Sequence, residues 1–174
     1  MTKLSTVVIG LVVFVLSFGT GLSAAGQETE VLTVQQAVEE LGVVPNEEEL
    51  TLVVIHLNDK SVEALFTTAP NMQQLQEQAA EATMLFVQGT NGSSDVVAPD
   101  LDWQVRRGDE LVTTRAVNIS NFEEGSAVPG GERYSGLVVA DKLIDHRSQF
   151  VVENGERQFT FTFSETQIEL IEGS

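Results

Sequence analysis

Residues 150–163 read FVVENGERQFTFTF. Two runs of β-branched and aromatic residues flank Asn154-Gly155, a pair that supplies the positive φ angles of a type I′ turn. Phe159, Phe161 and Phe163 alternate with threonines, which in a strand places three rings on one face and the hydroxyls on the other. This stretch therefore predicts a β-hairpin with one face buried in a core.

Comparable runs extend along the rest of the chain, separated by residues typical of turns. Thr33 begins a capping-box pattern that predicts a helix over 33–41, and amphipathic spacing predicts a second helix over 72–80. The other predicted strands cover residues 50–57 and 62–67, as a hairpin, and 82–88, 101–106, 111–119, 133–140 and 166–171. The chain is therefore expected to be mainly β, an antiparallel β-sandwich with two short helices in its N-terminal half.

Residues 128–163 add a finer expectation. A Pro-Gly turn at 129–130 precedes a predicted strand with an internal glycine, Gly136, and the hairpin follows. This order resembles the closing strands of immunoglobulin-like domains found on prokaryotic cell surfaces. The resemblance implies an immunoglobulin-like sandwich and carries over no functional residue.

The N-terminal residues form a separate segment. Lys3 is followed by an apolar run over 6–18 and by the small residues Ser23-Ala24-Ala25, the three-part pattern of a Sec-type signal peptide cleaved after Ala25. An uncleaved anchor over 4–25 is the alternative. Residues 1–25 are thus expected to direct export, to the cell exterior, the periplasm or the outer face of the membrane, with 26–32 an acidic linker and 33–174 a single domain.

The charge excludes whole classes of partner. The 174 residues include 26 acidic and 9 basic side chains, a formal net charge of −17. Nucleic-acid binding is not expected, because it depends on basic side chains that neutralise phosphates. Membrane contact is expected only if the N-terminal segment remains uncleaved. An acidic, lysine-poor chain also suggests a halophilic or marine source, a hypothesis that a melting temperature falling with added salt would contradict.

Nothing in the sequence predicts catalysis. Cysteine is absent, which removes disulfides and thiolate chemistry. No G-x-S-x-G motif is present, and Asp145-His146 has no identifiable nucleophile. The two histidines, His56 in a predicted strand and His146 in a predicted loop, form a metal site only if they meet in space with a carboxylate, so structural roles are expected for both. The chain is therefore predicted not to be an enzyme.

Acidic loops suggest one candidate ion site. Asp95, Asp100 and Asp102 crowd a loop beside Trp103, which we expect to fill the core. Loop carboxylates bind calcium in extracellular domains, although residues 100–104 do not match the EF-hand template. Calcium at these three aspartates is the candidate, and no other cofactor is predicted.

The expected function is that of an exported, non-enzymatic interaction or structural module. Its partner would be another envelope or extracellular protein, bound through a sheet edge or through loops 95–102 and 122–131. A calcium-binding or small-ligand-binding subunit of an envelope complex is the alternative. An extracellular hydrolase is third, and it would require a pocket that joins a histidine to a serine or to a pair of carboxylates.

Overall fold

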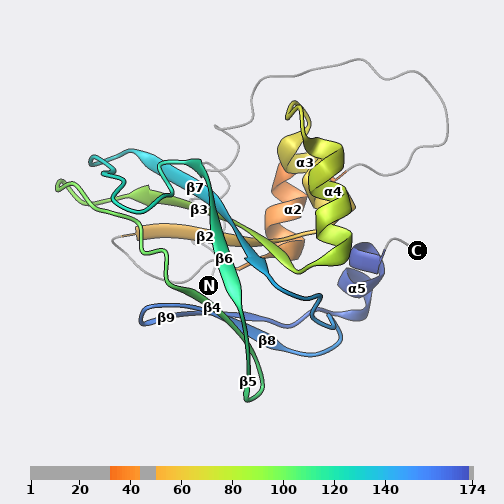
Figure 1. Ribbon diagram of the computed structural model, residues 1–174. Coiled ribbons are helices and arrows are strands. Elements are labelled where there is room, and N and C mark those ends of the chain that lie inside the picture. Colours follow the sequence, from red (N-terminus) through yellow and green to blue (C-terminus); the bar gives the residue numbers. More distant parts are fainter. Residues whose placement is uncertain (1–31, 44–49, 173–174) are drawn as a thin grey trace, which may run out of the picture.

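The computed structural model describes residues 32–43 and 50–172 (Figure 1). The predicted signal segment and nearly all of the predicted linker therefore lie outside the described residues. No helix within the described ranges is long and apolar enough to span a membrane.

The strands form two antiparallel sheets. The first has five strands in the order β1 (Gly42–Val43), β2 (Leu50–Leu57), β3 (Met84–Asn91), β7 (Arg133–Ala140) and β6 (Thr114–Ser120). The second has four, in the order β5 (Glu110–Val112), β4 (Trp103–Arg107), β8 (Phe150–Asn154) and β9 (Arg157–Phe161). The four described helices are α2 (Val34–Leu41), α3 (Asp59–Phe66), α4 (Met72–Glu81) and α5 (Glu165–Glu172).

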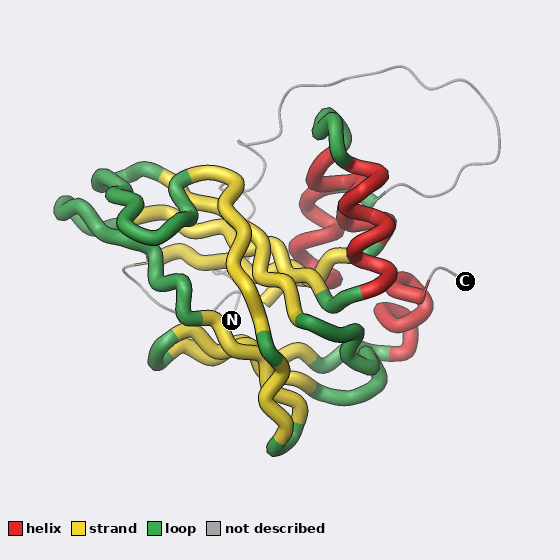
Figure 2. The backbone as a smooth tube through the Cα atoms, viewed as in Figure 1, coloured by secondary structure: helices red, strands yellow, loops and turns green. Residues whose placement is uncertain are grey.

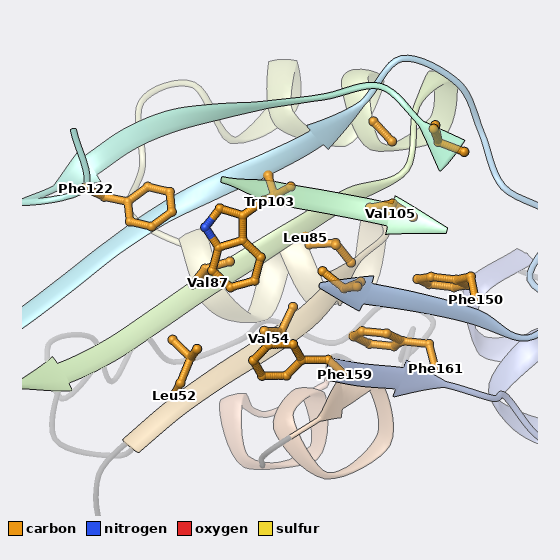
Figure 3. Packing of buried hydrophobic residues seen from close by; sticks show 14 of the residues in the cluster. Leu52, Val54, Leu85, Val87, Trp103, Val105, Phe122, Phe150, Phe159 and Phe161 are labelled. Carbon is orange, nitrogen blue, oxygen red and sulfur yellow. The ribbon is translucent and has the colours of Figure 1, made fainter. Parts of the chain in front are cut away.

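One core fills the space between the two sheets (Figure 3). Leu52 and Val54 of β2 face Phe159 and Phe161 of β9 across this space, and Trp103 of β4 lies there with only 4% of its surface exposed. The expected role of Trp103 in the core is confirmed. The two sheets therefore pack face to face.

A second core lies on the other face of the five-stranded sheet. Because side chains alternate along a strand, Val53, Ile55 and Leu57 of β2 point away from the sandwich and pack against helical residues such as Leu41 and Leu65. Figure 2 shows α2, α3 and α4 gathered on one side of the strands. The described chain thus has three layers: helices, a five-stranded sheet and a four-stranded sheet.

The prediction of a mainly β fold is confirmed, as are the helices over 33–41 and 72–80. The immunoglobulin-like type is not confirmed, because the structure adds a helical layer to the two sheets. Helices are also not confined to the N-terminal half, since α5 ends the described chain.

The predicted strand over 62–67 is wrong. These residues belong to α3, which begins after Asn58. The Asn58 side chain accepts a hydrogen bond from the Ser61 backbone N–H, and the Ser61 hydroxyl accepts one from the Asn58 N–H, both at 2.8 Å. This capping box stabilises the helix, and Val62 and Leu65 are buried at helical spacing. The segment is too short for apolar periodicity alone to distinguish a helix from a strand.

The two asparagine N-caps offer a matched test of this cap. Asn58→Ala is expected to lower the free energy of unfolding by about 1–2 kcal/mol, because it leaves a buried backbone N–H without a partner. Asn71 precedes α4 but makes no side-chain cap hydrogen bond, so Asn71→Ala should cost under about 0.5 kcal/mol. Urea unfolding of both variants measures the difference, and equal losses would contradict this account of the α3 boundary.

The predicted strand over 166–171 is also wrong. The segment is helix α5, and Ser164 and Gln167 form another capping box: the Ser164 N–H donates to the Gln167 side chain at 2.8 Å, and the Gln167 N–H donates to the Ser164 hydroxyl at 3.3 Å. Ile168 is the buried anchor of this helix. The capping-box spacing of Ser164 and Gln167 in the sequence indicates that a helix starts here, whereas the apolar residues alone do not indicate a helix.

The hairpin of residues 150–163 is confirmed, with a different turn. Asn154 pairs with Arg157, so Gly155 and Glu156 are the central turn residues, and of these only Gly155, at φ 59°, has a positive φ. A type I′ turn needs two, so the predicted turn type is wrong; glycine in the first central position is typical of type II′. Asn154 instead lies buried, and its amide donates to the carbonyls of Asp100 and Asp102 at 3.1 and 3.2 Å.

The predicted strand over 111–119 is two strands in different sheets. β5 pairs with β4, whereas β6 pairs with β7, and a single residue, Thr113, separates them. The Thr114 hydroxyl donates to the Trp103 carbonyl of β4 just after the crossing. The chain thus passes from one sheet to the other within one residue.

Candidate functional site

A cleft of about 510 Å³ lies at the end of β2 where the helices meet the sandwich. Residues from four regions line it: the end of β2 and start of α3, the end of α4, the loop between β7 and β8, and the end of α5. They are His56, Leu57, Asn58, Asp59, Ala79, Ala80, Leu143, Ile144, Asp145, His146, Ile171 and Glu172. Polar groups and apolar side chains are both well represented.

The two histidines meet in this cleft. His56 lies on the face of β2 that carries Leu52 and Val54, with 1% of its surface exposed, and His146 lies half-buried in the loop. Their Nε2 atoms are 2.9 Å apart, and the rings are nearly perpendicular with centroids 4.6 Å apart. Phe150 and Phe163 also lie close to His56, with ring centroids 6.4 and 5.5 Å away. The pair therefore has an aromatic wall on one side and the cleft on the other.

The loop that carries His146 is fixed by Thr83, which follows α4. The Thr83 hydroxyl accepts a hydrogen bond from the Ile144 N–H at 2.8 Å, and its N–H donates to the Lys142 carbonyl at 3.3 Å. Ile144 is fully buried in the core between the sheets. These contacts set the position of His146, two residues further along the chain.

Helix α5 closes the opposite rim of the cleft. The Arg147 guanidinium makes a two-pronged ion pair with the Glu172 carboxylate, with one of the two contacts at 2.9 Å. At the start of the helix, the Gln167 amide donates to the Glu40 carbonyl of α2. The rim thus joins the loop after β7, α5 and α2, although the exposed ion pair itself contributes little stability.

Both imidazoles are neutral at pH 7. Burial, and to a smaller extent the nearby His146, lowers the pKa of His56 from 6.5 to about 3. Burial also lowers the pKa of His146, against the opposing effect of Glu172 and Asp145. Two neutral rings can share one N–H between their Nε2 atoms. An additional proton, which would make either ring cationic, is disfavoured.

His56 Nδ1 is buried and has no hydrogen-bond partner in the described structure. If His56 donates its Nε2–H to His146, Nδ1 is a bare acceptor; if His56 accepts, Nδ1 carries a proton that donates to nothing. An unmet buried polar atom costs free energy in either case. A buried polar atom of this kind calls for an explanation, such as a bound water, an ion or a functional role.

The charged groups of the cleft are mainly carboxylates. Asp59, Asp145 and Glu172 line it, and Arg147 lies next to it through its ion pair with Glu172. Neutral imidazoles offer lone pairs rather than positive charge. The cleft is therefore suited to a cationic ligand.

The three aspartates of the candidate calcium site are exposed and lie outside this cleft. The Asp100 carboxylate accepts a hydrogen bond from the Asp102 N–H at 2.9 Å, and the Asp95 N–H donates to the Ser93 hydroxyl. In residues 32–43 and 50–172, no three His, Asp or Glu side chains are placed to hold a metal ion. Calcium at this loop stays a prediction, tested by the thermal shift at millimolar calcium in the native chain and in Asp100→Asn.

The histidine pair is what sequence reasoning missed. The two residues are 90 positions apart, and no spacing rule connects a strand residue to a loop residue at that separation. Two clues were present: the chain has only two histidines, and His56 shares the inward alternation of Leu52 and Val54. The clues identify candidates, whereas only the fold brings them together.

Comparison with known proteins gives no assignment. No protein-family model matches the chain, and no curated protein matches it. Among solved structures, the chain is similar to the crystal structure of a functionally unknown protein from Listeria monocytogenes EGD-e, with 12% identity over 83% of this chain and 100% of that one, and a TM-score of 0.37.

Proposed function

We propose that this protein is an exported, non-enzymatic binding protein that takes a small cationic ligand in the histidine cleft. The observation that carries the proposal is the contact of two neutral imidazoles, one buried and one half-buried, at a cleft edged by carboxylates. Lone pairs and negative charge together attract cations, and the strongly acidic chain raises their local concentration.

Binding is favoured over hydrolysis by the chemistry of the cleft wall. No serine, threonine or tyrosine side chain is among the described residues that line the cleft. Of the three carboxylates there, Glu172 is held by Arg147. Asp145 and Asp59 are exposed, so the described lining of the cleft holds no buried carboxylate pair beside the histidines.

An immunoglobulin-like interaction module would use a loop or a sheet edge instead. β6 is an edge strand, and its Ile119 is 45% exposed. Its pairing with β7 is interrupted by a bulge between Asn118 and Ser120, a device that proteins use to discourage further strand pairing. The edge therefore supports strand addition less than the cleft supports a ligand.

Nuclear magnetic resonance of the full-length chain tests the proposal. Putrescine, an organic dication, and Zn²⁺ are titrated separately, and at least one is expected to shift the amide resonances of Leu143, His146 and Ile171 saturably. Ala80→Trp places an indole at the cleft wall and should abolish the shifts. Ala127→Trp, at an exposed loop position, is the matched control and should preserve them. The proposal fails if neither cation shifts these resonances, or if Ala80→Trp leaves the shifts unchanged.

A further inference from the structure

We propose that the cation is a divalent first-row transition metal, bound by Nε2 of His56 and Nε2 of His146. This inference rests on the proposed function and names its ligand class. Two observations carry it independently of charge: the separation of the two nitrogens and the placement of the two rings.

The nitrogen separation equals that of neighbouring ligands on one metal ion. Imidazole nitrogens bind these ions at about 2.0–2.1 Å, so two of them at a right angle lie about 2.9 Å apart, and at a tetrahedral angle about 3.3 Å apart. The observed Nε2 separation is 2.9 Å. The pair therefore has the separation of two adjacent ligands in a square-planar or octahedral site.

The separation of the two ring centres is also that expected for two ligands on one metal ion. A ring centre lies about 1.1 Å behind its Nε2, so two rings that both point at a metal at a right angle have centres about 4.5 Å apart. A straight N–H···N hydrogen bond at the same nitrogen separation would put the centres about 5.1 Å apart. The observed centroid separation is 4.6 Å. Accommodating an ion thus requires little movement of either side chain.

Metal binding would replace the N–H···N hydrogen bond that the two rings share, and the cleft can supply the remaining ligands. Both histidines line the cleft. His56 Nδ1 has no partner with or without a metal, so binding sacrifices no hydrogen bond there. The cleft beside His146 admits water or an oxygen donor to complete the coordination, and Asp145 supplies nearby negative charge.

The same geometry predicts which ions bind most tightly. Nitrogen ligands at a right angle suit Cu²⁺ and Ni²⁺ better than the tetrahedral preference of Zn²⁺, and the Irving–Williams order also places Cu²⁺ first. Two imidazoles select against Mg²⁺ and Ca²⁺, which prefer oxygen. The expected order of affinity is Cu²⁺, then Ni²⁺, then Zn²⁺, with no binding of Mg²⁺ at this site.

Calorimetry and electron paramagnetic resonance of the untagged full-length chain test the inference. Cu²⁺ should bind at one ion per chain, and its spectrum should show hyperfine coupling to two nitrogens. His146→Gln, at a half-buried loop position, should weaken binding at least tenfold and remove one of the two couplings. Glu156→Gln, which removes an exposed carboxylate of the β8–β9 turn outside the cleft, should leave affinity unchanged and so controls for binding by general acidity.

The inference is overturned if Cu²⁺ does not saturate at one ion per chain, if its spectrum shows fewer than two nitrogens, or if His146→Gln binds as tightly as the native chain. The spectrum needs no variant, so the test does not depend on the folding of a His56 substitution. If putrescine shifts the cleft resonances while no transition metal binds, the metal inference falls and the proposed function stands. If neither binds, both fall.

Discussion

Lowering the pH from about 8 to about 5 is expected to reduce the free energy of unfolding by about 2 kcal/mol through His56 alone. In the folded protein His56 stays neutral down to its pKa of about 3, whereas in the unfolded chain an imidazole takes a proton below about pH 6.5. Between these values the unfolded chain binds more protons, so stability is fully present above about pH 6.5 and is lost as the pH falls. The lowered pKa of His146 adds a loss of the same sign.

Urea unfolding with a metal chelator present, at the two pH values, measures this loss. His56→Phe keeps an aromatic ring beside Phe150 and Phe163 and removes the titrating group, so its pH dependence should be smaller by about 2 kcal/mol. His146→Gln should keep most of the His56 contribution, because burial is the larger cause of that pKa shift. An unchanged pH dependence in His56→Phe would show that His56 is not the buried neutral group described above.

Gly136→Ala is expected to destabilise the protein by about 3 kcal/mol. Gly136 lies in β7 opposite Phe122, and an added Cβ would lie 1.8 Å from the Phe122 ring. The ring is fully buried and stacked on Tyr134, with centroids 6.2 Å apart, so it has no free space to move into. The strand or the ring must shift, and packing between the sheets is lost.

A double-mutant cycle separates this clash from a general intolerance of alanine in β7. Phe122→Ala alone should cost about 3–5 kcal/mol, because it leaves a cavity in the core. Adding Gly136→Ala to that variant should cost little more, since the ring that blocks the methyl group is gone. Additive losses, measured by urea unfolding, would show that Phe122 is not the obstacle.

Strand positions were readable from the sequence where alternation was long and the turn residues were explicit. The Phe159 and Phe161 alternation and the run over 133–140 correspond to β9 and β7 directly. Alternation of apolar and polar residues is a local property, so it identifies a strand even when the partner strand is unknown.

Short apolar segments were not readable in the same way. VEALFT and TQIELI are each about six residues long, a length at which strand and helix patterns overlap. The deciding information lay in the preceding polar residue, because Asn58 and Ser164 each have a capping partner three residues later. The sheet partners of β5 and β6 depended on contacts distant in sequence, which no local pattern contains.

The candidate site was the least predictable part. Its chemistry comes from His56 and His146, which meet only because Thr83 fixes a loop against the end of β2. The acidic composition favoured a site in an acidic loop instead, because Asp95, Asp100 and Asp102 lie close together in the sequence. The sequence does not show that His56 and His146 are close in space.

The crossing at Thr113 bears on how this protein unfolds. β5 and β6 are consecutive in the chain yet belong to different sheets, so neither sheet can open without pulling on the other through a connection of one residue. The hydrogen bond from the Thr114 hydroxyl of β6 to the Trp103 carbonyl of β4 joins the two sheets beside this connection. Loss of the four-stranded sheet and of the five-stranded sheet should therefore be a single cooperative event, in which tryptophan fluorescence and far-ultraviolet circular dichroism report the same midpoint.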